Sequence, residues 1–230
     1  MHKFYQLKIK AVTPEPNAVI WTLEIPDNLA EEFNYLPGQH LTFKATINGE
    51  ELRRSYSICS SPKRKGELDV LIKTVADGRF SQAAIKDFQA GATVEVLPPS
   101  GHFVLNPQAD HAYVGFAAGS GITPVMGMLR TLDRAGTMPD VVLVHGARTS
   151  EDTIFRAELA GLAARHPSLR VQLHLTGEHG RLTPDGLAEY CPDWRERSTW
   201  ACGPEAMLDE AEDLWESAGR GAALHVERFS

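Results

Sequence analysis

The chain has 230 residues, of which 43% are hydrophobic and 23% charged, and its formal net charge is −7. These proportions are typical of a globular protein with one large or two smaller domains, and the acidic balance argues against general nucleic-acid binding. No apolar stretch approaches the ~20 residues that cross a bilayer, and the three widely separated cysteines argue against a disulfide framework and predict a cytoplasmic, reduced protein.

The first half of the chain has the pattern of short strands. Alternation of apolar and polar residues predicts six of them, at 7–12, 19–25, 41–47, 52–58, 68–73 and 93–97. Asn48-Gly49 predicts a hairpin turn, and one short helix is expected near 80–88. Six short strands separated by turn signals indicate a small antiparallel barrel or sandwich.

The fourth of these strands carries a basic, aromatic and hydroxyl-bearing run, Arg54-Ser55-Tyr56-Ser57. Residues two apart share a face of a strand, so Arg54 and Tyr56 project together, with Ser57 at the next position. A guanidinium suits a pyrophosphate, and a tyrosine ring suits stacking on a flat heterocycle. A flavin dinucleotide has both parts. The run alone equally fits an ordinary half-exposed strand with an arginine and a tyrosine on one face.

The second half of the chain alternates buried strands with helices. Apolar runs predict strands at 113–117, 141–144, 171–175, 199–201 and 223–226. Helices are predicted between them, at 124–135, 153–165, 184–190 and 204–217. This alternation indicates right-handed βαβ units and a parallel sheet. We therefore expect two domains, an antiparallel β-barrel at 1–106 and an α/β parallel-sheet (Rossmann-like) nucleotide domain at 107–230.

Two glycine-containing turns follow predicted strands of the second domain. In Gly119-Ser120-Gly121-Ile122-Thr123-Pro124, Thr123 is the expected N-cap of a helix and Pro124 its first residue. Glycine lets the backbone approach a ligand closely, and a helix N-terminus offers N–H groups to an anion. Cys202-Gly203-Pro204 repeats the arrangement, and both turns are expected at one crevice because ligands gather at the carboxyl ends of strands. A tight turn without a ligand, and a small buried hydrophobe for Cys202, stay open as alternatives.

Five short motifs occur in a fixed order along the chain. They are Arg54-Ser55-Tyr56-Ser57, Gly78-Arg79-Phe80-Ser81, the turn from Gly119 to Pro124, Cys202-Gly203-Pro204 and His225-Val226-Glu227-Arg228-Phe229. Together they resemble the ferredoxin–NADP reductase superfamily, and within it the reductase components of bacterial oxygenases of the phenylacetyl-CoA epoxidase and steroid hydroxylase type. The resemblance covers essentially the whole chain. It implies an FAD-binding barrel, an NAD(P)-binding α/β domain and hydride transfer between the two cofactors at the domain interface.

The resemblance implies FAD-binding roles in the first domain. Arg54 would clamp the pyrophosphate, Tyr56 would stack on the isoalloxazine, and Ser57 would lie near flavin N5. The other residues so implied are Ser55 in the same motif, the second flavin strand at Leu71, Ile72 and Lys73, and the pyrophosphate helix start at Gly78, Arg79, Phe80 and Ser81. For that helix start, a glycine turn leading to a surface helix remains the alternative.

The second domain would hold the nicotinamide coenzyme. The resemblance places its pyrophosphate side at Gly119, Ser120, Gly121 and Thr123, and its nicotinamide ring near Cys202, Gly203 and Pro204. Glu227 matches an acidic residue near the hydride-transfer site, and Phe229 an aromatic residue near the carboxyl end. Solvated residues of a frayed terminus are the alternative for both. Ser57, Cys202 and Glu227 are thus the implied catalytic residues, and the first two are expected to position rather than react.

Coenzyme preference depends on the turn after the second strand of this domain. Arg148 could pair with the 2′-phosphate of NADPH, and Thr149 or Ser150 could hydrogen-bond it. Asp152 could instead repel that phosphate, and an arginine here could also stack on adenine without selecting a coenzyme. We expect NADPH in preference to NADH.

The resemblance implies a ferredoxin-type [2Fe–2S] domain or protein as the electron acceptor, with an oxygenase component as a further partner. The three cysteines cannot form the plant-type cluster that many relatives carry, so the chain is expected to be a two-domain reductase or one cut at the domain junction. Basic docking candidates are Lys63-Arg64-Lys65 and the face with Lys3, Lys8 and Lys10. Alternatives are a flavin, quinone or haem-protein reductase, and a flavin-binding electron-transfer subunit without turnover.

Overall fold

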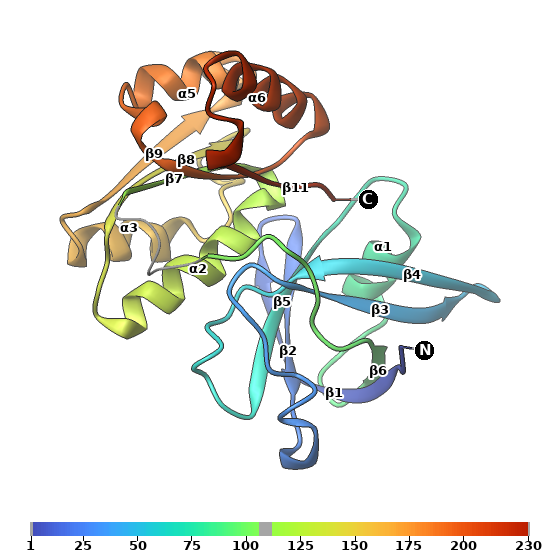
Figure 1. Ribbon diagram of the computed structural model, residues 1–230. Coiled ribbons are helices and arrows are strands. Elements are labelled where there is room, and N and C mark those ends of the chain that lie inside the picture. Colours follow the sequence, from blue (N-terminus) through green and yellow to red (C-terminus); the bar gives the residue numbers. More distant parts are fainter. Residues whose placement is uncertain (1, 106–111, 230) are drawn as a thin grey trace. The chain divides into compact units, whose positions relative to one another are not determined.

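The computed structural model describes residues 2–105 and 112–229 (Figure 1). They form two compact units. The first comprises the chain up to Val104 together with Met126–Thr131, and the second comprises Leu105–Val125 and Leu132–Phe229. The expected boundary between 106 and 107 lies outside the described residues and stays a prediction. Among the described residues, no helix is long and apolar enough to cross a membrane.

Within the described residues, the first unit is a six-stranded antiparallel sheet. Its strands are β1 (Tyr5–Glu15), β2 (Ala18–Glu24), β3 (His40–Ile47), β4 (Glu50–Ser57), β5 (Glu67–Lys73) and β6 (Thr93–Val96), in the spatial order β4-β3-β6-β1-β2-β5. Just after β4, Ile58 forms a bridge to Val70, and the Cys59 N–H donates to the Asp69 carbonyl at 2.9 Å. The two ends of the sheet are thus joined. This closure confirms the predicted antiparallel barrel.

Aromatic side chains fill this barrel because strand alternation directs every second residue inward. Trp21 is fully buried and packs edge-on against Phe43, with ring centroids 5.6 Å apart. Phe80 lies 6.4 Å from each of these two rings. Phe80 belongs to helix α1 (Arg79–Lys86), so its burial fixes the first turn of that helix against the barrel.

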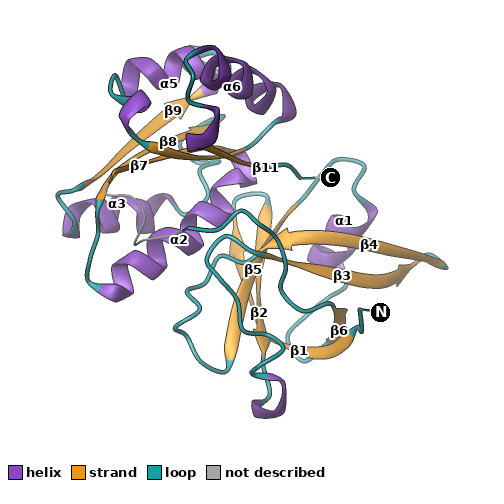
Figure 2. Cartoon of the chain, in the orientation of Figure 1, coloured by secondary structure: helices purple, strands orange, loops and turns teal. Residues whose placement is uncertain are grey.

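The second unit is a parallel sheet with helices between the strands (Figure 2). Its strands are β7 (Ala112–Ala118), β8 (Asp140–Ala147), β9 (Leu169–Leu175), β10 (Ser198–Cys202) and β11 (Leu224–Glu227), in the order β11-β10-β7-β8-β9. The helices between these strands are α2 (Ile122–Ala135), whose middle part Met126–Thr131 belongs to the first unit, and α3 (Arg156–Arg165), α4 (Thr176–His179), α5 (Pro184–Tyr190) and α6 (Glu205–Ser217). The central strands are buried, as expected for a sheet covered on both faces. The predicted α/β parallel-sheet fold is confirmed.

Short 3-10 helices complete the described elements, at η1 (Asp27–Leu29), η2 (Gly119–Gly121), η3 (Trp194–Glu196) and η4 (Gly221–Ala223). The predicted helix at 153–165 begins only at Arg156. Phe155 adopts a left-handed φ of 60°, and the Thr153 hydroxyl donates to the Thr149 carbonyl at 3.0 Å. These local bonds hold the preceding residues in a turn.

One buried arginine joins the amino ends of three strands in the second unit. The Arg197 side chain is 3% exposed, and its guanidinium binds Asp140 and Asp193, each at 3.0 Å. It also donates to the Tyr113 carbonyl. Asp140, Tyr113 and Arg197 stand at the starts of β8, β7 and β10, opposite the carboxyl ends where ligands bind in such sheets. Arg197 therefore supports the sheet from the edge away from the expected site.

Candidate functional site

The pairing of β3 with β4 sets the direction of the basic and aromatic residues. Arg54 pairs with Phe43, and Tyr56 pairs with Leu41. The two partners are fully buried, so Arg54 and Tyr56 share the face of β4 that meets the barrel interior at its rim. This confirms the predicted common face. The Arg54 guanidinium is exposed and donates only to the neighbouring Arg53 carbonyl, at 2.7 Å, among the bonds of the described residues.

Tyr56 is brought next to a residue of another motif. Its ring lies 5.7 Å from that of Phe80 and 6.1 Å from that of Phe43. Burial raises the pKa of Tyr56 to about 12, so the phenol is neutral at physiological pH. The Tyr56 ring thus forms an aromatic platform near the end of β4, which packs against Phe43 and Phe80 of the barrel core.

Ser57 directly follows Tyr56 as the last residue of β4 and pairs with His40 of β3. Its side chain is 3% exposed, and its hydroxyl has no hydrogen-bond partner among the described residues. Buried polar groups are nearly always paired, so an orphaned hydroxyl indicates a position that a bound group completes. A ring nitrogen of a flavin has the hydrogen-bonding chemistry that such a hydroxyl needs. The residues therefore fit the FAD site that the sequence predicts.

The strand β5 offers backbone groups beside this position. Leu71 and Ile72 are buried, and β5 pairs through them with β2 on one edge. On the opposite edge of β5, the described residues show one pairing, the bridge between Ile58 and Val70. Leu71–Lys73 lie beyond this bridge. Their backbone N–H and C=O groups on that edge can bond a ligand, as the sequence predicts for this strand.

The helix start at Gly78–Ser81 is shaped by contacts within the motif and near it. The Ser81 hydroxyl accepts from the Val75 N–H and donates to the Gly78 carbonyl, both at 3.1 Å. Arg79 pairs with Glu50 at 2.6 Å. Two side chains expected at an anion therefore have protein partners, and the first-turn N–H groups of α1 are what the motif can offer. Val75, beside them, is 60% exposed, an apolar surface that no sequence motif indicated.

In the second unit, the first glycine turn differs from the expected helix start. Gly119 adopts a φ of 58°, and residues Gly119–Gly121 form a 3-10 turn that continues directly into α2. Thr123 is therefore not the N-cap, and Pro124 is not the first helical residue. The Thr123 hydroxyl donates back to the Ser120 carbonyl at 2.6 Å, a bond available only because the turn is already helical. Thr123 thus stabilises the turn from inside.

The two glycine turns of the second unit meet through their backbones. A Cβ added at Gly121 would lie 2.0 Å from the Cys202 carbonyl oxygen and 3.0 Å from the Gly203 nitrogen. Only glycine allows this approach. His145, which was not among the predicted residues, lies fully inside β8 with Nε2 3.3 Å from the Gly119 carbonyl oxygen. The sequence signal for His145 was its position directly after the apolar run of a predicted central strand.

Cys202 and Glu227 are neighbours at the carboxyl ends of β10 and β11. The two residues are partners in the parallel pairing. Burial raises the pKa of the Cys202 thiol well above its ordinary value, and the Glu227 carboxylate raises it further. The thiol is therefore protonated and unreactive at neutral pH, which suits a positioning role. Phe229 is 45% exposed just beyond β11.

Arg148 stands just after β8, with its guanidinium exposed. Its carbonyl accepts from the Gly177 N–H at 3.0 Å, which brings the turn after β9 against it. The Asp152 carboxylate accepts from the Thr149 hydroxyl at 3.0 Å, and the Ser150 hydroxyl accepts from Arg156 at 2.5 Å. The turn after β9, starting at Thr176, was not part of the predicted site, although its Thr-Gly sequence at a strand end could have indicated it.

Two of the six basic docking candidates, Arg64 and Lys10, form ion pairs among the described residues. Arg64 pairs with Glu67 at 2.5 Å and with Asp69 at 2.6 Å, and Lys10 also pairs with Glu67, at 2.8 Å. Lys3 lies over the Tyr5 ring, 5.1 Å from its centroid. Whether either group docks a partner stays a prediction.

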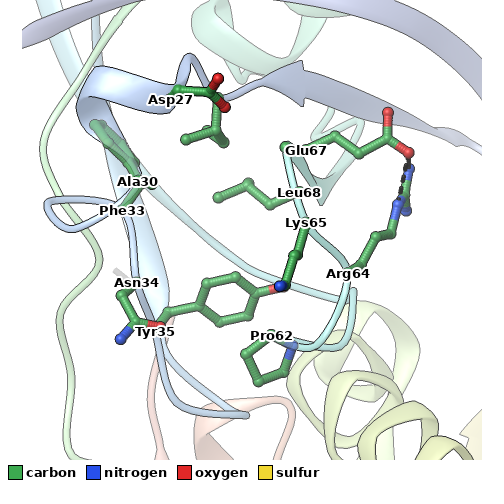
Figure 3. A pocket seen from close by; sticks show the side chains of 12 residues that line it. Asp27, Ala30, Phe33, Asn34, Tyr35, Pro62, Arg64, Lys65, Glu67 and Leu68 are labelled. Carbon is green, nitrogen blue, oxygen red and sulfur yellow. Dashed lines mark hydrogen bonds and ion pairs between the residues drawn. The ribbon is translucent and has the colours of Figure 1, made fainter.

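A cavity of about 410 Å³ also lies in the first unit, between the segment after β2 and the loop before β5 (Figure 3). Phe33, Tyr35 and Leu68 form its apolar part, and the Tyr35 hydroxyl bonds Ser60 at 2.8 Å. Arg64, bound to Glu67, lines one side. None of its lining residues belongs to the five motifs. The cavity is therefore separate from the residues predicted to hold the cofactors.

Comparison with known proteins divides the chain in the same way. Residues 8–105 match the family described as oxidoreductase FAD-binding domain, and residues 116–213 match the family described as oxidoreductase NAD-binding domain. Both predicted cofactor classes are thereby supported independently of the motifs.

Curated relatives include redox enzymes of several bacteria. An NADPH oxidoreductase of Mycobacterium tuberculosis is 42% identical over 212 residues, covering 91% of this chain and 56% of the relative. A component of the 1,2-phenylacetyl-CoA epoxidase of Escherichia coli is 37% identical over 246 residues, covering 100% and 69%. The ferredoxin reductase component of 3-ketosteroid-9-alpha-monooxygenase from Rhodococcus rhodochrous is 35% identical, covering 90% and 59%. The chain thus spans between about half and two thirds of the length of these relatives.

Solved structures agree with this arrangement. Phthalate dioxygenase reductase aligns with a TM-score of 0.76 at 27% identity, covering 98% of this chain and 68% of that chain. The FAD/NAD-binding domain of nitric oxide dioxygenase from Vibrio cholerae aligns with a TM-score of 0.83 at 21% identity, covering 97% and 98%. The alignment with the nitric oxide dioxygenase domain, at 21% identity, supports only the fold.

Proposed function

Because the chain belongs to the ferredoxin–NADP reductase family of FAD- and NAD-binding oxidoreductases, we propose that it transfers hydride from a reduced nicotinamide coenzyme to FAD and passes the electrons to a redox partner. When bound, FAD supplies N5 as the hydride acceptor and a ring that can release electrons one at a time. The protein supplies binding, alignment and exclusion of water. The observation that carries the proposal is the buried Ser57 hydroxyl, which directly follows Tyr56 in β4 and has no hydrogen-bond partner among the described residues.

On the first unit, side chains and strand edges hold the flavin. Tyr56 provides a flat surface for the isoalloxazine, and Ser57 hydrogen-bonds the ring near N5. Arg54, exposed and in no ion pair within 4 Å among the described residues, pairs with the pyrophosphate. The first-turn N–H groups of α1 share that charge. Exposed Val75 gives the remaining part of the cofactor an apolar contact.

On the second unit, backbone groups hold the nicotinamide coenzyme. The turn from Gly119 to Gly121 gives its N–H groups to the pyrophosphate, and Cys202 with Gly203 forms the neighbouring wall. The neutral Cys202 thiol and the Glu227 carboxylate position the nicotinamide ring. Neither residue has to exchange a proton with the coenzyme, because hydride transfer needs no general base.

The coenzyme is NADPH in preference to NADH. Arg148 is exposed at the carboxyl edge of the sheet, and its charge suits a 2′-phosphate. Asp152, which could repel that phosphate, is engaged by the Thr149 hydroxyl. The NADPH oxidoreductase relative supports this preference.

The acceptor is a ferredoxin-type [2Fe–2S] domain or protein that serves an oxygenase, and the enzyme works in the cytoplasm. The support is the class of relative, which includes an epoxidase component and a ferredoxin reductase component. Stopped-flow assays with a [2Fe–2S] ferredoxin, free flavin, a quinone and cytochrome c test this. Preference for any of the last three would replace the acceptor without changing the flavin chemistry.

Reduction of the flavin under anaerobic stopped-flow conditions tests the central proposal. We expect Ser57→Ala to slow reduction by NADPH by about tenfold, since one hydrogen bond to the reacting ring is lost. Bound FAD, measured by its visible absorbance, should stay largely intact. A protein that binds no flavin, or whose flavin is bleached by neither coenzyme, would refute the proposed function.

A further inference from the structure

One buried histidine of the second unit has no role in the function proposed above. His145 lies near the carboxyl end of β8, between its register partners Ala117 of β7 and Leu173 of β9. Its exposed fraction is 1%, so the ring belongs to the covered interior of the parallel sheet. An apolar side chain would fill this place at lower cost, because a buried polar group costs free energy unless it is hydrogen-bonded. The hydrogen bond that His145 makes therefore indicates what the side chain does.

That bond goes to the Gly119 carbonyl, in the first glycine turn. His145 Nε2 lies 3.3 Å from this oxygen. A carbonyl oxygen only accepts, so Nε2 carries the hydrogen and donates it. The same oxygen accepts from the N–H of Ile122, the first residue of α2, and its two lone pairs allow both bonds. The Gly119 carbonyl is thus held by one donor from α2 and one from β8.

The backbone at Gly119 needs such bonds to keep one orientation. Its φ of 58° is left-handed, whereas Ala118 before it is extended, with a φ of −136°. Glycine adopts left-handed and right-handed conformations about equally readily. Local preference therefore does not fix the peptide that joins Gly119 to Ser120, and its orientation depends on the two bonds to its carbonyl.

The same peptide carries the N–H of Ser120. It is a trans peptide, so its C=O and N–H groups lie in one plane and point in opposite directions. Because the carbonyl is directed to α2 and to His145, the Ser120 N–H is directed away from both, out of the beginning of the helix. Ser120 is only half-buried, so a ligand can reach this group. It is one of the N–H groups that the proposed function assigns to the coenzyme pyrophosphate.

We propose that His145 is a positioning residue for coenzyme binding, an inference that rests on the proposed function. By holding the Gly119 carbonyl, His145 directs the Ser120 N–H to the pyrophosphate of the nicotinamide coenzyme. The other end of the turn is fixed separately, by the close approach of Gly121 to the Cys202 carbonyl. In this role His145 neither contacts the coenzyme nor exchanges a proton with it. The role needs only a hydrogen-bond donor at the position of Nε2.

This requirement makes the reach of the side chain the main test. Glutamine carries an amide donor that extends about as far as Nε2, asparagine carries the same amide one methylene shorter, and leucine has no donor. We expect His145→Leu and His145→Asn to raise the KM for NADPH about tenfold, the effect of one lost hydrogen bond. His145→Gln should stay within about twofold of wild type. The kcat of all three should change less than about twofold, because the pyrophosphate is held equally before and during hydride transfer.

Inhibition by coenzyme fragments shows which part of the coenzyme is affected. NADP⁺ contains the pyrophosphate, whereas adenosine 2′-monophosphate does not. In His145→Leu and His145→Asn, the inhibition constant of NADP⁺ should rise about tenfold and that of adenosine 2′-monophosphate should stay unchanged. In a protein that prefers NADH, NAD⁺ and adenosine take their places. Equal rises for both inhibitors would mean a general disturbance of the second unit and would overturn the positioning role.

His166→Leu is the matched control for lost stability. His166 Nε2 bonds the Asp133 carboxylate at 2.6 Å, and His166 precedes β9, at the edge of the sheet away from the Gly119 turn. Its replacement should lower the melting temperature and leave the inhibition constant of NADP⁺ unchanged. A weaker inhibition by NADP⁺ in this control would attribute the His145 effects to stability and overturn the role.

A measurement on the wild type makes the test independent of how the variants fold. In ¹⁵N-labelled protein followed by NMR, saturating NADP⁺ should shift the Ser120 amide signal, and adenosine 2′-monophosphate should not. An unmoved Ser120 signal, or a His145→Leu protein that binds NADP⁺ as tightly as a wild type that NADPH reduces normally, overturns the positioning role alone. A wild type that binds no flavin or accepts no hydride overturns the proposed function instead.

Discussion

The two units present their candidate sites in different ways. In the first unit the site consists of side chains at the end of β4, where Tyr56 lies on an aromatic core and the Ser57 hydroxyl lacks a partner among the described residues. In the second unit it consists of backbone, where Gly121 packs against the Cys202 carbonyl so closely that a single added carbon would lie 2.0 Å away. Truncating one side chain of the first site should weaken ligand binding only partly. Enlarging a glycine of the second site should disrupt ligand binding altogether, because its closely packed backbone has to move.

The largest effect is expected from Gly121→Ala. The added methyl group has to displace the backbone of Cys202, and such overpacking costs about 3 kcal/mol. NADPH-dependent flavin reduction should fall by at least about 100-fold, because the whole phosphate turn moves. FAD absorbance should persist, since the change lies in the other unit.

Gly161→Ala is the matched control for that change. Gly161 lies inside α3, and an added Cβ would meet only the end of the Arg165 side chain, at 3.7 Å. Alanine should stabilise the helix by about 0.5–1 kcal/mol and leave the kinetics unchanged. Urea unfolding and the KM for NADPH measure both effects. If Gly121→Ala and Gly161→Ala had the same stability and the same KM for NADPH, the close packing of Gly121 against Cys202 would not be needed for coenzyme binding.

A second prediction separates the two edges of the parallel sheet. Arg197→Met should destabilise the protein by about 2 kcal/mol. This cost is smaller than that of breaking a fully buried ion pair, because Asp140 and Asp193 are about half exposed. The KM values for the coenzyme should not change, because Arg197 supports the amino ends of the strands. A change in KM without loss of stability would mean that this edge contributes to binding.

The same ion pair predicts a pH dependence of stability. The Arg197 guanidinium bonds Asp193 and holds the pKa of that carboxyl below its ordinary value. A lowered folded-state pKa stabilises the protein above the unfolded-state value near 4 and ceases to do so as pH falls. The stability difference between wild type and Arg197→Met should therefore shrink below about pH 4. Urea midpoints at about pH 3.5 and 7 measure it.

A third prediction concerns the aromatic platform of the first unit. Tyr56→Leu should weaken FAD binding by about tenfold, because the stacking surface is lost while apolar volume remains. Tyr56→Phe should change FAD affinity less than about twofold, since Phe keeps the ring that stacks. Fluorescence titration of the apoprotein with FAD compares them. Equal affinities of the Leu and Phe variants would mean that the ring does not stack on the flavin.

The smallest effect is expected at Arg148, which is exposed and therefore screened. Arg148→Ala should lower kcat/KM for NADPH about fivefold and leave that for NADH nearly unchanged, since only NADPH carries the 2′-phosphate. Arg156→Ala is a neighbouring control, because Arg156 is engaged with Ser150. A fall for both coenzymes would instead favour stacking of Arg148 on adenine.

Periodicity was sufficient for the strands and the longer helices, but it missed α4 and did not fix where the elements begin and end. The period of two along Arg54-Ser55-Tyr56-Ser57 predicted the shared face of Arg54 and Tyr56, and register with β3 confirmed it. Thr123 looked like an N-cap because threonine before proline usually is one. The 3-10 turn that places it inside the helix depends on how Gly121 packs against Cys202, a contact between residues 81 positions apart. Helix propensity carries no information about such a contact.

Local alternation was enough to predict the two architectures and the order of the strands along the chain, whereas most of the residues expected to hold a flavin and a nicotinamide came from the resemblance to a known family. The tertiary structure decided which of those side chains have protein partners and which can bond a ligand. It engaged Ser81 and Arg79 with neighbouring groups and left the Ser57 hydroxyl without a partner among the described residues. Hydrogen-bond satisfaction and burial are properties of residues brought together across strands, because register, not sequence distance, sets those neighbours.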